Sequence, residues 1–418
     1  MQAIIDNLIY IIGDKQVVDK ICLQPALEPF SDEVVTFLNT VSKAILDNKE
    51  EGAYPDVITF AFWCRRASIE TMKKEYIREH GGLSNNGDNT SMNKNHIRYG
   101  RGCVFHIAPS NVAVNYAYSL VVGMLAGNVN IVRLPSKYFP QINLINNGIK
   151  KAIEKYPQFA PYICIVSYGH ENEITDYFSL KCDTRIIWGG DNTIAEIRKS
   201  PLKPRANEVT FADRYSISVI DSKKYLEMEG KDRIASDFYN DTYLTDQNAC
   251  TSPRIVIWIG KEEISRKAQE VFWSELAALV EEKYVLQSVQ AVSKLASVYR
   301  IGANFNGARL NEAVSYRPSN KLIRVQIQEL SGELMEYKNN SGFFMEYFAE
   351  NLGEIEPICN SQCQTLSYLG VAKEDIKLFI IDSKPKGIDR VVSIGKTMDF
   401  DLFWDGYDLI GQLTRNVI

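Results

Sequence analysis

The sequence lacks several features that would point directly to a class of partner. Its 47 Lys and Arg residues are outnumbered by 52 Asp and Glu residues, which gives a formal net charge of −5. A nucleic-acid-binding surface needs a basic excess to neutralise phosphates, so we do not expect nucleic acid as a partner. The most apolar stretch, 112–126, is too short to span a bilayer and contains Asn115. We therefore expect no membrane span.

A secretory leader and a disulfide framework are not expected either. Residues 1–15 carry Asp6 and no basic segment ahead of their apolar residues. The eight cysteines have no framework spacing, and no His or second Cys pair lies near Cys359 and Cys363 to complete a zinc site. We expect a cytoplasmic protein with reduced thiols and no bound metal. A cysteine in an unusual local setting is then a candidate for chemistry.

Two common phosphate-binding motifs are also missing. The chain has no Walker A sequence, and Gly100 and Gly102 precede a predicted strand instead of following one. A G-x-G-x-x-G motif must follow a strand and open a helix to hold a pyrophosphate. An ordinary Rossmann dehydrogenase is therefore disfavoured.

The sequence does contain a long alternation of strand-like and helix-like segments. With 418 residues, 45% of them hydrophobic and 24% charged, the chain has a globular composition and the length of two or three domains. Short β-rich runs that alternate with helices predict a doubly wound parallel sheet covered on both faces. The predicted strands are 103–108, 129–134, 162–166, 184–188 and 216–220, and the predicted helices are 112–126, 142–155, 173–179 and 194–199.

A second α/β unit is predicted from about residue 235. The first hundred residues are predicted to be helical, with an amphipathic helix over 31–48 capped by Ser31, more helix over 56–79, and a polar loop or hairpin over 81–95. In the second unit the predicted helices are 235–244 and 261–280, and the predicted strands are 254–259, 322–328 and 376–381.

The first turn of interest follows the strand at 103–108 and contains Ala108, Pro109, Ser110 and Asn111. Doubly wound sheets bind ligands at the carboxyl ends of their strands, which is where this turn lies. The amide of Asn111 is a candidate oxyanion donor. The alternative is that Ser110 or Asn111 only caps the next helix.

Two further turns suit phosphate groups. Arg133, Ser136 and Lys137 follow a strand, and two cations with a hydroxyl suit the ribose and 2′-phosphate of NADP; a solvated surface turn is the alternative. Gly189 and Gly190 lead into a helix and permit backbone N–H groups to approach a pyrophosphate. A bare glycine pair is by itself a weak signal.

Cys250 stands in an unusual setting for a cysteine. It lies in the polar, small-residue loop 246–254 between a predicted helix and a predicted strand, whereas Cys164 lies in the apolar run typical of a buried thiol. A nucleophile needs exposure and nearby donors that favour the thiolate. Cys250 is therefore a candidate nucleophile, and a structural thiol is the alternative.

Taken together, these segments resemble the aldehyde dehydrogenase superfamily. The turn at 108–111, the stretch 125–137, the turn at 188–190 and the cysteine loop keep that superfamily's order and spacing. The LuxC-type acyl-CoA (fatty-acyl) reductases are a closer match and cover most of the chain from Gly100 onward. The segments that carry this closer resemblance are 106–111, 211–216, 249–253, 390–395 and 399–408.

The resemblance implies an aldehyde-dehydrogenase-like α/β fold, with a doubly wound parallel-sheet cofactor domain and a second α/β domain that carries the catalytic cysteine. The implied domains are a helical region 1–98 packed on the cofactor domain, a nicotinamide cofactor domain 99–234, a catalytic domain 235–388, and a segment 389–418 that returns to the cofactor domain. Ala108, Pro109, Ser110, Arg133, Ser136, Lys137, Gly189 and Gly190 are the implied cofactor-binding residues.

The implied reaction is reduction of an acyl thioester to the aldehyde through an S-acyl intermediate on Cys250, with Asn111 as oxyanion donor. Two departures from the aldehyde-oxidising pattern favour reduction with NADPH. Ala212 replaces the glutamate that would activate water, and the neighbouring Asp213 would point to the opposite face of an extended segment. Lys137 replaces a glutamate that would repel the 2′-phosphate, so NADPH is favoured over NADH.

Several alternatives stay open at this stage. The same cysteine could serve an aldehyde dehydrogenase that works in the oxidative direction, a cofactor-independent thioesterase or acyltransferase, or a catalytically inactive scaffold. His106 and His170 are candidate proton donors only because the chain has few histidines. The expected partners are an acyl-CoA or acyl-carrier substrate, an acyl-protein synthetase as in family relatives, and, by analogy, a second copy of the chain.

Overall fold

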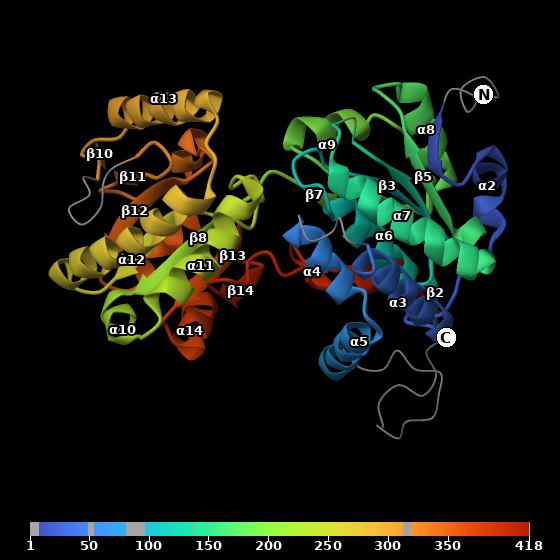
Figure 1. The fold of residues 1–418 in the computed structure, drawn as a ribbon, viewed down its shortest axis with the longest axis horizontal. Coiled ribbons are helices and arrows are strands. Elements are labelled where there is room, and N and C mark those ends of the chain that lie inside the picture. The colour runs from blue at the N-terminus through green and yellow to red at the C-terminus, as the bar shows by residue number, and fades with distance from the viewer. Residues whose placement is uncertain (1–7, 49–53, 81–96, 136, 312–318, 418) are drawn as a thin grey trace. The chain divides into compact units, whose positions relative to one another are not determined.

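The computed structural model describes residues 8–48, 54–80, 97–135, 137–311 and 319–417. The chain forms two compact units. The first comprises Met1–Ala212 together with Phe400–Ile418, and the second comprises Asp213–Asp399. Both are α/β units (Figure 1), and this confirms the predicted fold class.

The first unit is built around a six-stranded sheet in the order β1-β5-β4-β3-β6-β7. All neighbouring strands run parallel except β1, which pairs antiparallel with β5. The order runs outward in both directions from the β3–β6 pair, so the topological switch point lies there. The strands are β1 (Ile9–Ile12), β3 (Cys103–Ile107), β4 (Val129–Arg133), β5 (Ile163–Ser167), β6 (Thr184–Trp188) and β7 (Asn207–Phe211).

Helices from two parts of the chain pack on this sheet. The first hundred residues contain strand β1 as well as the predicted helices. Helix α3, from this region, packs against α7, which comes later in the chain. Gly148 of α7 permits this contact, because a Cβ atom there would lie 2.6 Å from Cγ1 of Ile45. The helices of the first unit are α2 (Lys15–Lys20), α3 (Asp32–Leu46), α4 (Pro55–Trp63), α5 (Arg66–His80), α6 (Asn115–Leu125), α7 (Pro140–Lys155), α8 (Asn172–Lys181) and α9 (Asp191–Ile197), with the 3-10 helices η1 (Ile21–Leu23) and η3 (Pro157–Tyr162).

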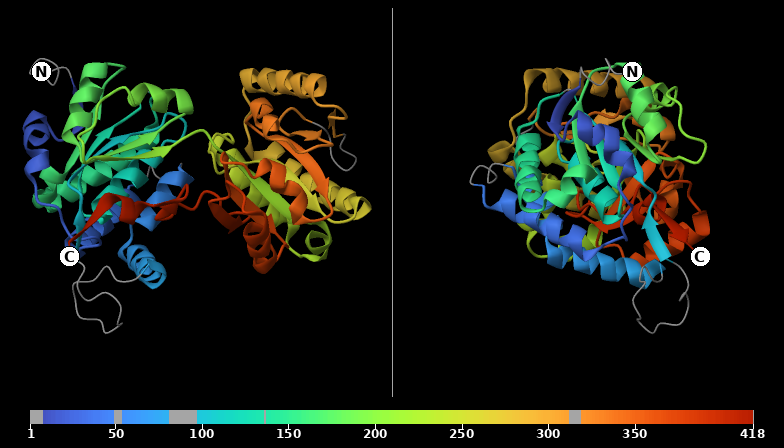
Figure 2. Two further views of the ribbon diagram at one scale, coloured as in Figure 1. Left: turned by 180° about the vertical axis from the view of Figure 1, so that it is seen from behind. Right: turned by 90° about the vertical axis from the view of Figure 1, so that its right-hand side faces the viewer.

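The C-terminal segment completes the first unit. Its last strand, β17 (Thr414–Val417), pairs antiparallel with β2 (Ile97–Gly100), and the red end of the chain lies along this unit in Figure 2. The Tyr76 hydroxyl donates to Asp408 Oδ2 at 2.8 Å. The remaining elements of this segment are β15 (Phe403–Trp404), β16 (Tyr407–Asp408) and α15 (Leu409–Leu413).

The second unit holds a seven-stranded sheet in the order β10-β11-β12-β9-β8-β13-β14. It is parallel apart from β10. The strands are β8 (Tyr215–Asp221), β9 (Pro253–Ile259), β10 (Arg309–Leu310), β11 (Ile323–Gln326), β12 (Phe343–Ala349), β13 (Cys363–Leu369) and β14 (Arg390–Ser393). The helices are α10 (Ser222–Glu227), α11 (Lys231–Thr242), α12 (Glu262–Lys283), α13 (Ser288–Asn304) and α14 (Lys373–Ser383), with the 3-10 helices η4 (Tyr243–Thr245), η5 (Gly332–Tyr337) and η6 (Leu352–Ile358).

Two predicted elements are corrected by the structure. The strand at 216–220 is present as β8, but it pairs with β9 and β13 in the second sheet and not with the first. The segment 376–381 is not a strand, because it lies within helix α14, whose first turn carries Glu374 and Asp375. Acidic side chains in a first turn stabilise a helix, and this signal outweighs the apolar run that resembled a strand.

The helix at 56–79 also differs, since it is divided into α4 and α5. The predicted loop at 81–95 lies outside the described residues. The two compact units divide after Ala212 and after Asp399, whereas the sequence-based functional domains divide after residues 98, 234 and 388. Those functional boundaries stay predictions.

Candidate functional site

Three candidate cofactor turns lie at one edge of the first sheet. They follow β3, β4 and β6, which are neighbours in the order β4-β3-β6. The carboxyl ends of parallel strands meet at the same edge, so the turns are brought together there. The turns after β3 and β6 flank the topological switch point, where open α/β sheets bind their ligands.

The turn after β3 exposes Ser110 and Asn111 while Pro109 is buried. Helix α6 begins only at Asn115, with Val114 as its N-cap residue and no side-chain capping bond. Neither Ser110 nor Asn111 therefore caps the helix, and this excludes the alternative interpretation of the turn. The backbone N–H of Ala108 donates to Arg133 O at 3.0 Å and ties this turn to the next one.

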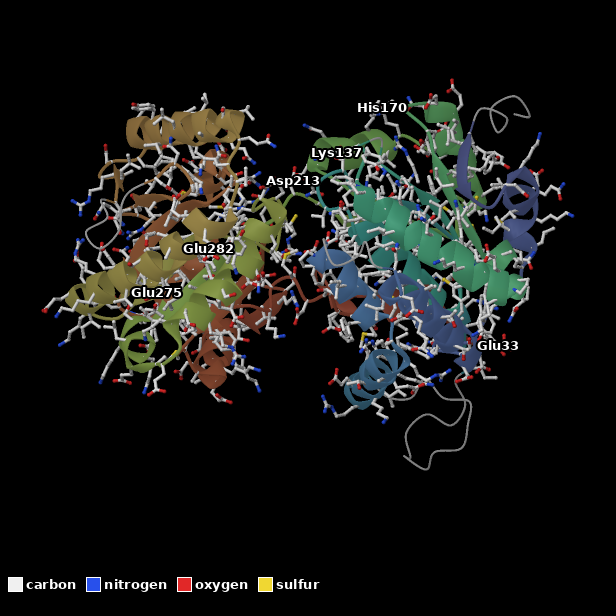
Figure 3. The ribbon with its side chains drawn as sticks, viewed as in Figure 1. Glu33, Lys137, His170, Asp213, Glu275 and Glu282 are labelled. Carbon is white, nitrogen blue, oxygen red and sulfur yellow. The ribbon has the colours of Figure 1, made fainter. Side chains whose placement is uncertain are left out.

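The turn after β4 contains two cations in different settings. The Arg133 guanidinium donates to Gly169 O and lies 4.5 Å from the centroid of the Tyr168 ring, so it is already engaged within the unit. Lys137 is exposed, with its ammonium 4.8 Å from the Phe139 ring centroid. Figure 3 shows Lys137 at the same end of the unit as His170. The predicted Ser136 lies outside the described residues.

The turn after β6 is shaped by packing. Gly190 is the N-cap residue of α9, and the backbone N–H of Gly189 donates to Phe211 O at 3.2 Å. A Cβ atom on Gly189 would lie 3.0 Å from Cγ2 of Thr193, so a larger residue there would have to displace that side chain of α9. The Trp188 ring stacks on Phe211 with centroids 3.7 Å apart and holds β6 against β7.

His106 is part of the first unit's core. Its Nδ1 lies 2.7 Å from Ser119 Oγ and its Nε2 lies 3.0 Å from Asn130 Oδ1, and the side chain is fully buried. Burial lowers the pKa of His106 to about 4, so the ring is neutral near pH 7. His106 is therefore unsuited to protonate a leaving group, whereas His170 is exposed.

Cys250 lies in a turn of the second unit, immediately before β9, and is half-buried. The preceding residues Asp246 and Gln247 have φ angles of 51° and 58°, in the left-handed region that non-glycine residues rarely adopt. Such a conformation costs about 1–3 kcal/mol per residue and persists only where surrounding contacts hold it.

The side chain of Gln247 supplies those contacts. It is fully buried, and its Oε1 accepts from the backbone N–H groups of Gly342 at 3.0 Å and Phe343 at 3.1 Å. Its Nε2 donates to Pro253 O at 2.9 Å and to Phe343 O at 3.1 Å. One amide thus fastens the cysteine turn to the first residues of β9 and β12.

Arg254 places a buried cation near the thiol. Its Nη1 donates to Asn339 O at 2.7 Å and to the Asn340 side chain, whose Nδ2 donates to Asn248 Oδ1 at 2.6 Å. Burial lowers the pKa of Arg254 to about 10, and the charge of Cys250 acts in the opposite direction. The attraction is mutual, so Arg254 favours the Cys250 thiolate.

The sequence did not point to Gln247 or Arg254 as residues of the site. For Arg254 a signal was available, because it is a charged residue at the start of an apolar strand.

The segment 211–216, singled out from the sequence, also supports the cysteine. Ser216 Oγ donates to Cys250 O at 2.7 Å. Tyr215 Oη donates to Ile358 O at 2.6 Å, and the Arg214 guanidinium pairs with Asp389. The start of β8 therefore fixes the backbone of the nucleophile candidate.

Asp213 differs from its prediction. Strand β7 ends at Phe211, and Asp213 is an exposed residue in the bend before β8. Strand alternation therefore does not place it on the face opposite Ala212. Asp213 therefore places an exposed carboxylate next in sequence to Ala212, where it is a candidate base for activating water.

The eight cysteines all lie in the described part of the chain, and all are free thiols. Only Cys22 and Cys250 are not buried. Cys22 interacts with the buried Cys103, and this hydrogen bond lowers the pKa of Cys22 to about 7. Exposure alone therefore leaves Cys22 and Cys250 as candidate nucleophiles. The anchored left-handed residues before Cys250 favour Cys250.

The family comparison concerns the chain as a whole. Residues 30–416 match the acyl-CoA reductase (LuxC) family. The chain belongs to this family. Membership supports an oxidoreductase that acts on acyl or aldehyde substrates, and Cys22 lies outside the matched residues. No curated protein sequence matches the chain.

Solved structures that are similar to the chain include aldehyde dehydrogenases, and they show its fold. A lactaldehyde dehydrogenase has 12% identity and a TM-score of 0.65, with 96% of this chain and 88% of that chain covered. Aldehyde dehydrogenase 21 from Physcomitrella patens, in complex with succinate, has 13% identity, the same coverage and a TM-score of 0.66. NADP-dependent glyceraldehyde-3-phosphate dehydrogenase from Bacillus halodurans, complexed with NADP, has 14% identity, a TM-score of 0.57 and again 96% and 88% coverage.

The described residues lack two other features. Among the residues that the structure describes, no helix is long and apolar enough to cross a membrane. Within the same residues, no group of three or more His, Cys, Asp or Glu side chains is arranged to hold a metal ion.

Proposed function

We propose that this protein reduces an acyl thioester to the aldehyde with NADPH, through an acyl group carried on Cys250. The observation that carries the proposal is the cysteine turn. A half-buried thiol follows the left-handed residues Asp246 and Gln247, which buried hydrogen bonds of Gln247 anchor, and it interacts electrostatically with the buried Arg254, in a chain of the acyl-CoA reductase (LuxC) family. These are the conditions under which a thiolate acts as a nucleophile.

The covalent step uses groups from the chain itself. The Cys250 thiolate attacks the thioester carbonyl, and the backbone N–H of Cys250 and the Asn111 amide donate to the resulting oxyanion. The oxyanion then re-forms the carbonyl, the C–S bond to the donor thiol breaks, and the donor leaves as a thiolate that takes a proton from solvent. An S-acyl-cysteine remains. Loss of one such oxyanion donor typically costs about 3–4 kcal/mol of transition-state stabilisation.

The first unit supports the cofactor part of the proposal. The residues fit a dinucleotide because two of their turns flank the switch point of a doubly wound sheet, and because Lys137 presents an exposed cation on the neighbouring turn after β4. Ala108, Pro109 and Ser110 would line the nicotinamide side, Gly189 and Gly190 the pyrophosphate, and Arg133, Ser136 and Lys137 the ribose 2′-phosphate. NADPH would supply a hydride to the acyl carbon, and the C–S bond to Cys250 then breaks, so that the aldehyde leaves and the Cys250 thiolate is restored.

The direction of the reaction follows from the position of Ala212. A methyl side chain cannot activate water against the acyl-enzyme, so hydrolysis to the acid is not assisted from that position. Asp213 is the nearest carboxylate in sequence. If Asp213 served as a base, the protein would release free acid, and Asp213→Asn would abolish that release while sparing reduction.

The test begins with the acyl-enzyme. The full chain is incubated with acyl-CoAs of graded length, the protein mass is measured, and NADPH is then added and aldehyde is detected. We expect one acyl adduct in the wild type and in Cys22→Ala, none in Cys250→Ala, and one aldehyde per NADPH consumed. Free acid without NADPH oxidation would instead establish a thioesterase, and an adduct on Cys250→Ala would refute the nucleophile.

The acyl donor in the cell is a second part of the proposal. A thioester carried by coenzyme A or a carrier protein can react directly, whereas an acyl-protein synthetase would hand over its acyl group after docking. Comparing the rate of Cys250 acylation from acyl-CoA with that from an acylated synthetase separates these routes. A synthetase that gives no faster acylation than acyl-CoA argues against it as the partner.

A further inference from the structure

A pair of hydrogen-bonded thiols lies at the amino end of β3, at the edge of the first sheet opposite to the candidate cofactor turns. Cys103 is the first residue of β3 and is buried, whereas Cys22, in the 3-10 helix η1, is exposed. The two side chains are joined by a hydrogen bond. Cys22 precedes residues 30–416, which match the acyl-CoA reductase (LuxC) family, so family membership implies nothing about this pair.

The backbone of Cys103 is fixed by Asp183. The Cys103 N–H donates to Asp183 Oδ2 at 2.9 Å, and the Asp183 N–H donates to Cys103 O at 2.7 Å. Lys203 Nζ pairs with the other carboxylate oxygen, Oδ1, at 2.9 Å. The buried thiol is therefore held next to Cys22 by a strand whose own first residue is anchored on both sides.

Cations surround the exposed member of the pair. Helix α2, which leads into η1, lies beside the end of helix α8 (Figure 1), where Lys181 Nζ donates to Val18 O at 2.9 Å and Cys22 Sγ lies 3.7 Å from Lys181 O. The hydrogen bond from Cys103 lowers the pKa of Cys22 to about 7, and the charges of Lys181 and Lys203 act in the same direction. Cys22 is therefore partly a thiolate near neutral pH, in the exposed and electropositive setting that is typical of reactive cysteines.

We propose that Cys22 is a site of oxidation by hydroperoxides, and that Cys103 converts the oxidised Cys22 into an intrachain disulfide. An exposed, reactive thiol beside a second thiol is the arrangement that oxidation-sensitive cysteines share. Thiols that already share a hydrogen bond need only a small side-chain movement to reach bonding distance, whereas cysteines that the backbone holds apart cannot be bridged. The Cys22–Cys103 pair therefore combines access for the oxidant with a partner for the oxidised sulfur.

The reaction takes place in two steps. The Cys22 thiolate attacks the terminal oxygen of the hydroperoxide, an S–O bond forms as the O–O bond breaks, and the alkoxide or hydroxide that leaves takes a proton from water. Cys22 is thereby oxidised to a sulfenic acid and the peroxide is reduced. The Cys103 sulfur then attacks the Cys22 sulfur, the S–O bond breaks, and the hydroxide leaves with the Cys103 proton as water.

The remaining buried thiols show why accessibility is decisive. Cys182 also lies near Cys22, but it is buried and its Sγ donates to Ser179 O at 3.2 Å. Cys359 and Cys363 form a second hydrogen-bonded thiol pair, in the second unit, and both are buried. An oxidant in solution therefore reaches the pair that contains Cys22 and not the second pair, although both pairs have two sulfurs in contact.

The experiment uses the full chain with Cys250→Ala, so that oxidation of the proposed nucleophile does not contribute. Hydrogen peroxide is added to the reduced protein, the remaining thiols are blocked, and the products are followed by intact mass and peptide mapping. We expect the loss of two hydrogens and a crosslinked peptide that joins Cys22 to Cys103. Cys22 should be oxidised at least about tenfold faster than Cys359 or Cys363. Dithiothreitol should restore the original mass.

Two variants separate the roles of the two sulfurs. Cys103→Ala should stop at a sulfenic acid on Cys22 that a dimedone probe traps, and Cys22→Ala should give neither product. Cys182→Ala is the matched control and should form the disulfide at the rate of the parent protein; circular dichroism checks that each variant is folded. A Cys22 that stays reduced, a crosslink to Cys182 or between two chains, or equally fast oxidation of Cys359 and Cys363 would each overturn the proposal.

Discussion

The ligand-side turns of the first sheet and the cysteine turn of the second sheet are fastened in different ways. The turns of the first sheet are tied by backbone hydrogen bonds, such as Ala108 N–H to Arg133 O, while Asn111 and Lys137 are exposed. The cysteine turn is fastened by buried side chains, above all Gln247. The proposed nucleophile is thus positioned by buried side chains, whereas the proposed cofactor turns carry Asn111 and Lys137 on exposed positions.

The largest expected effect comes from the exposed side. Asn111→Ala should lower kcat for aldehyde formation by roughly 10²–10³-fold, because one oxyanion donor is lost. Ser110→Ala, at the adjacent exposed position, is the control and should change kcat by much less. Steady-state kinetics with an acyl-CoA measure both. A double-mutant cycle with Cys250→Ser tests whether Asn111 and Cys250, from different units, act on one intermediate.

The buried core behind that turn should respond to pH. Burial holds the pKa of His106 in the folded protein at about 4, below its ordinary value of 6.5. Acid therefore protonates the unfolded chain first, and stability that is present above pH 6.5 is lost as pH falls toward 4. The difference in unfolding free energy between the wild type and His106→Gln should drift by roughly 3 kcal/mol over this window. A difference that stays constant with pH would show that His106 titrates normally in the folded protein.

Removing the anchor of the cysteine turn should affect both stability and chemistry. Gln247→Ala leaves buried backbone N–H groups of Gly342 and Phe343 without this acceptor, at a cost of about 2–3 kcal/mol in unfolding free energy. Acylation of Cys250 should slow as the turn relaxes. Gln364→Ala, a buried glutamine of β13, is the stability control. If both variants acylate at the wild-type rate, the anchor has no part in positioning the nucleophile.

The buried cation should set the reactivity of the thiol. Arg254→Gln is expected to raise the pH midpoint of Cys250 alkylation by about one unit, since an opposite charge nearby lowers a thiol pKa by roughly 1–3 units. Arg254→Lys should restore part of the shift. Alkylation followed by mass spectrometry against pH measures the midpoint, with Cys22 in the same molecule as an internal reference. A loss of folding without a shifted midpoint would assign Arg254 a structural role alone.

The smallest expected effect concerns cofactor choice. Lys137→Glu should weaken NADPH by about tenfold or more relative to NADH, because a carboxylate repels the 2′-phosphate that the ammonium attracts. Binding titrations with both cofactors check this. Equal weakening of NADPH and NADH would remove the 2′-phosphate argument, and the remaining preference would have to come from Arg133 or another group.

Much of the fold was predictable because the strands are short apolar runs with clear ends. Strands β4, β6 and β9 lie within one residue of their predicted positions. The sheet to which β8 belongs was not predictable, since its partners β9 and β13 are set by pairing with distant segments. Helix α14 was mistaken for a strand because Leu378–Ile381 is a continuous apolar run, and two of its members, Leu378 and Ile381, prove to be exposed.

The candidate site was predictable where the residue type itself carries the chemistry. Cys250 and Asn111 could be proposed from a thiol and an amide in polar turns together with the family resemblance, and their roles stay predictions. The contribution of Gln247 was not predictable, because a left-handed φ at a glutamine and its bonds to β12 leave no mark in the local sequence.

The return of the chain to the first unit has a consequence for synthesis. The second unit, Asp213–Asp399, is contiguous, whereas the first unit closes only when β17 pairs with β2. A ribosome therefore releases every residue of the second unit before the last strand of the first one emerges. Until then β2 is an unpaired edge, which is the kind of surface that recruits chaperones or other nascent chains. Residues 400–418 thus complete the first unit only after the whole second unit has been synthesised.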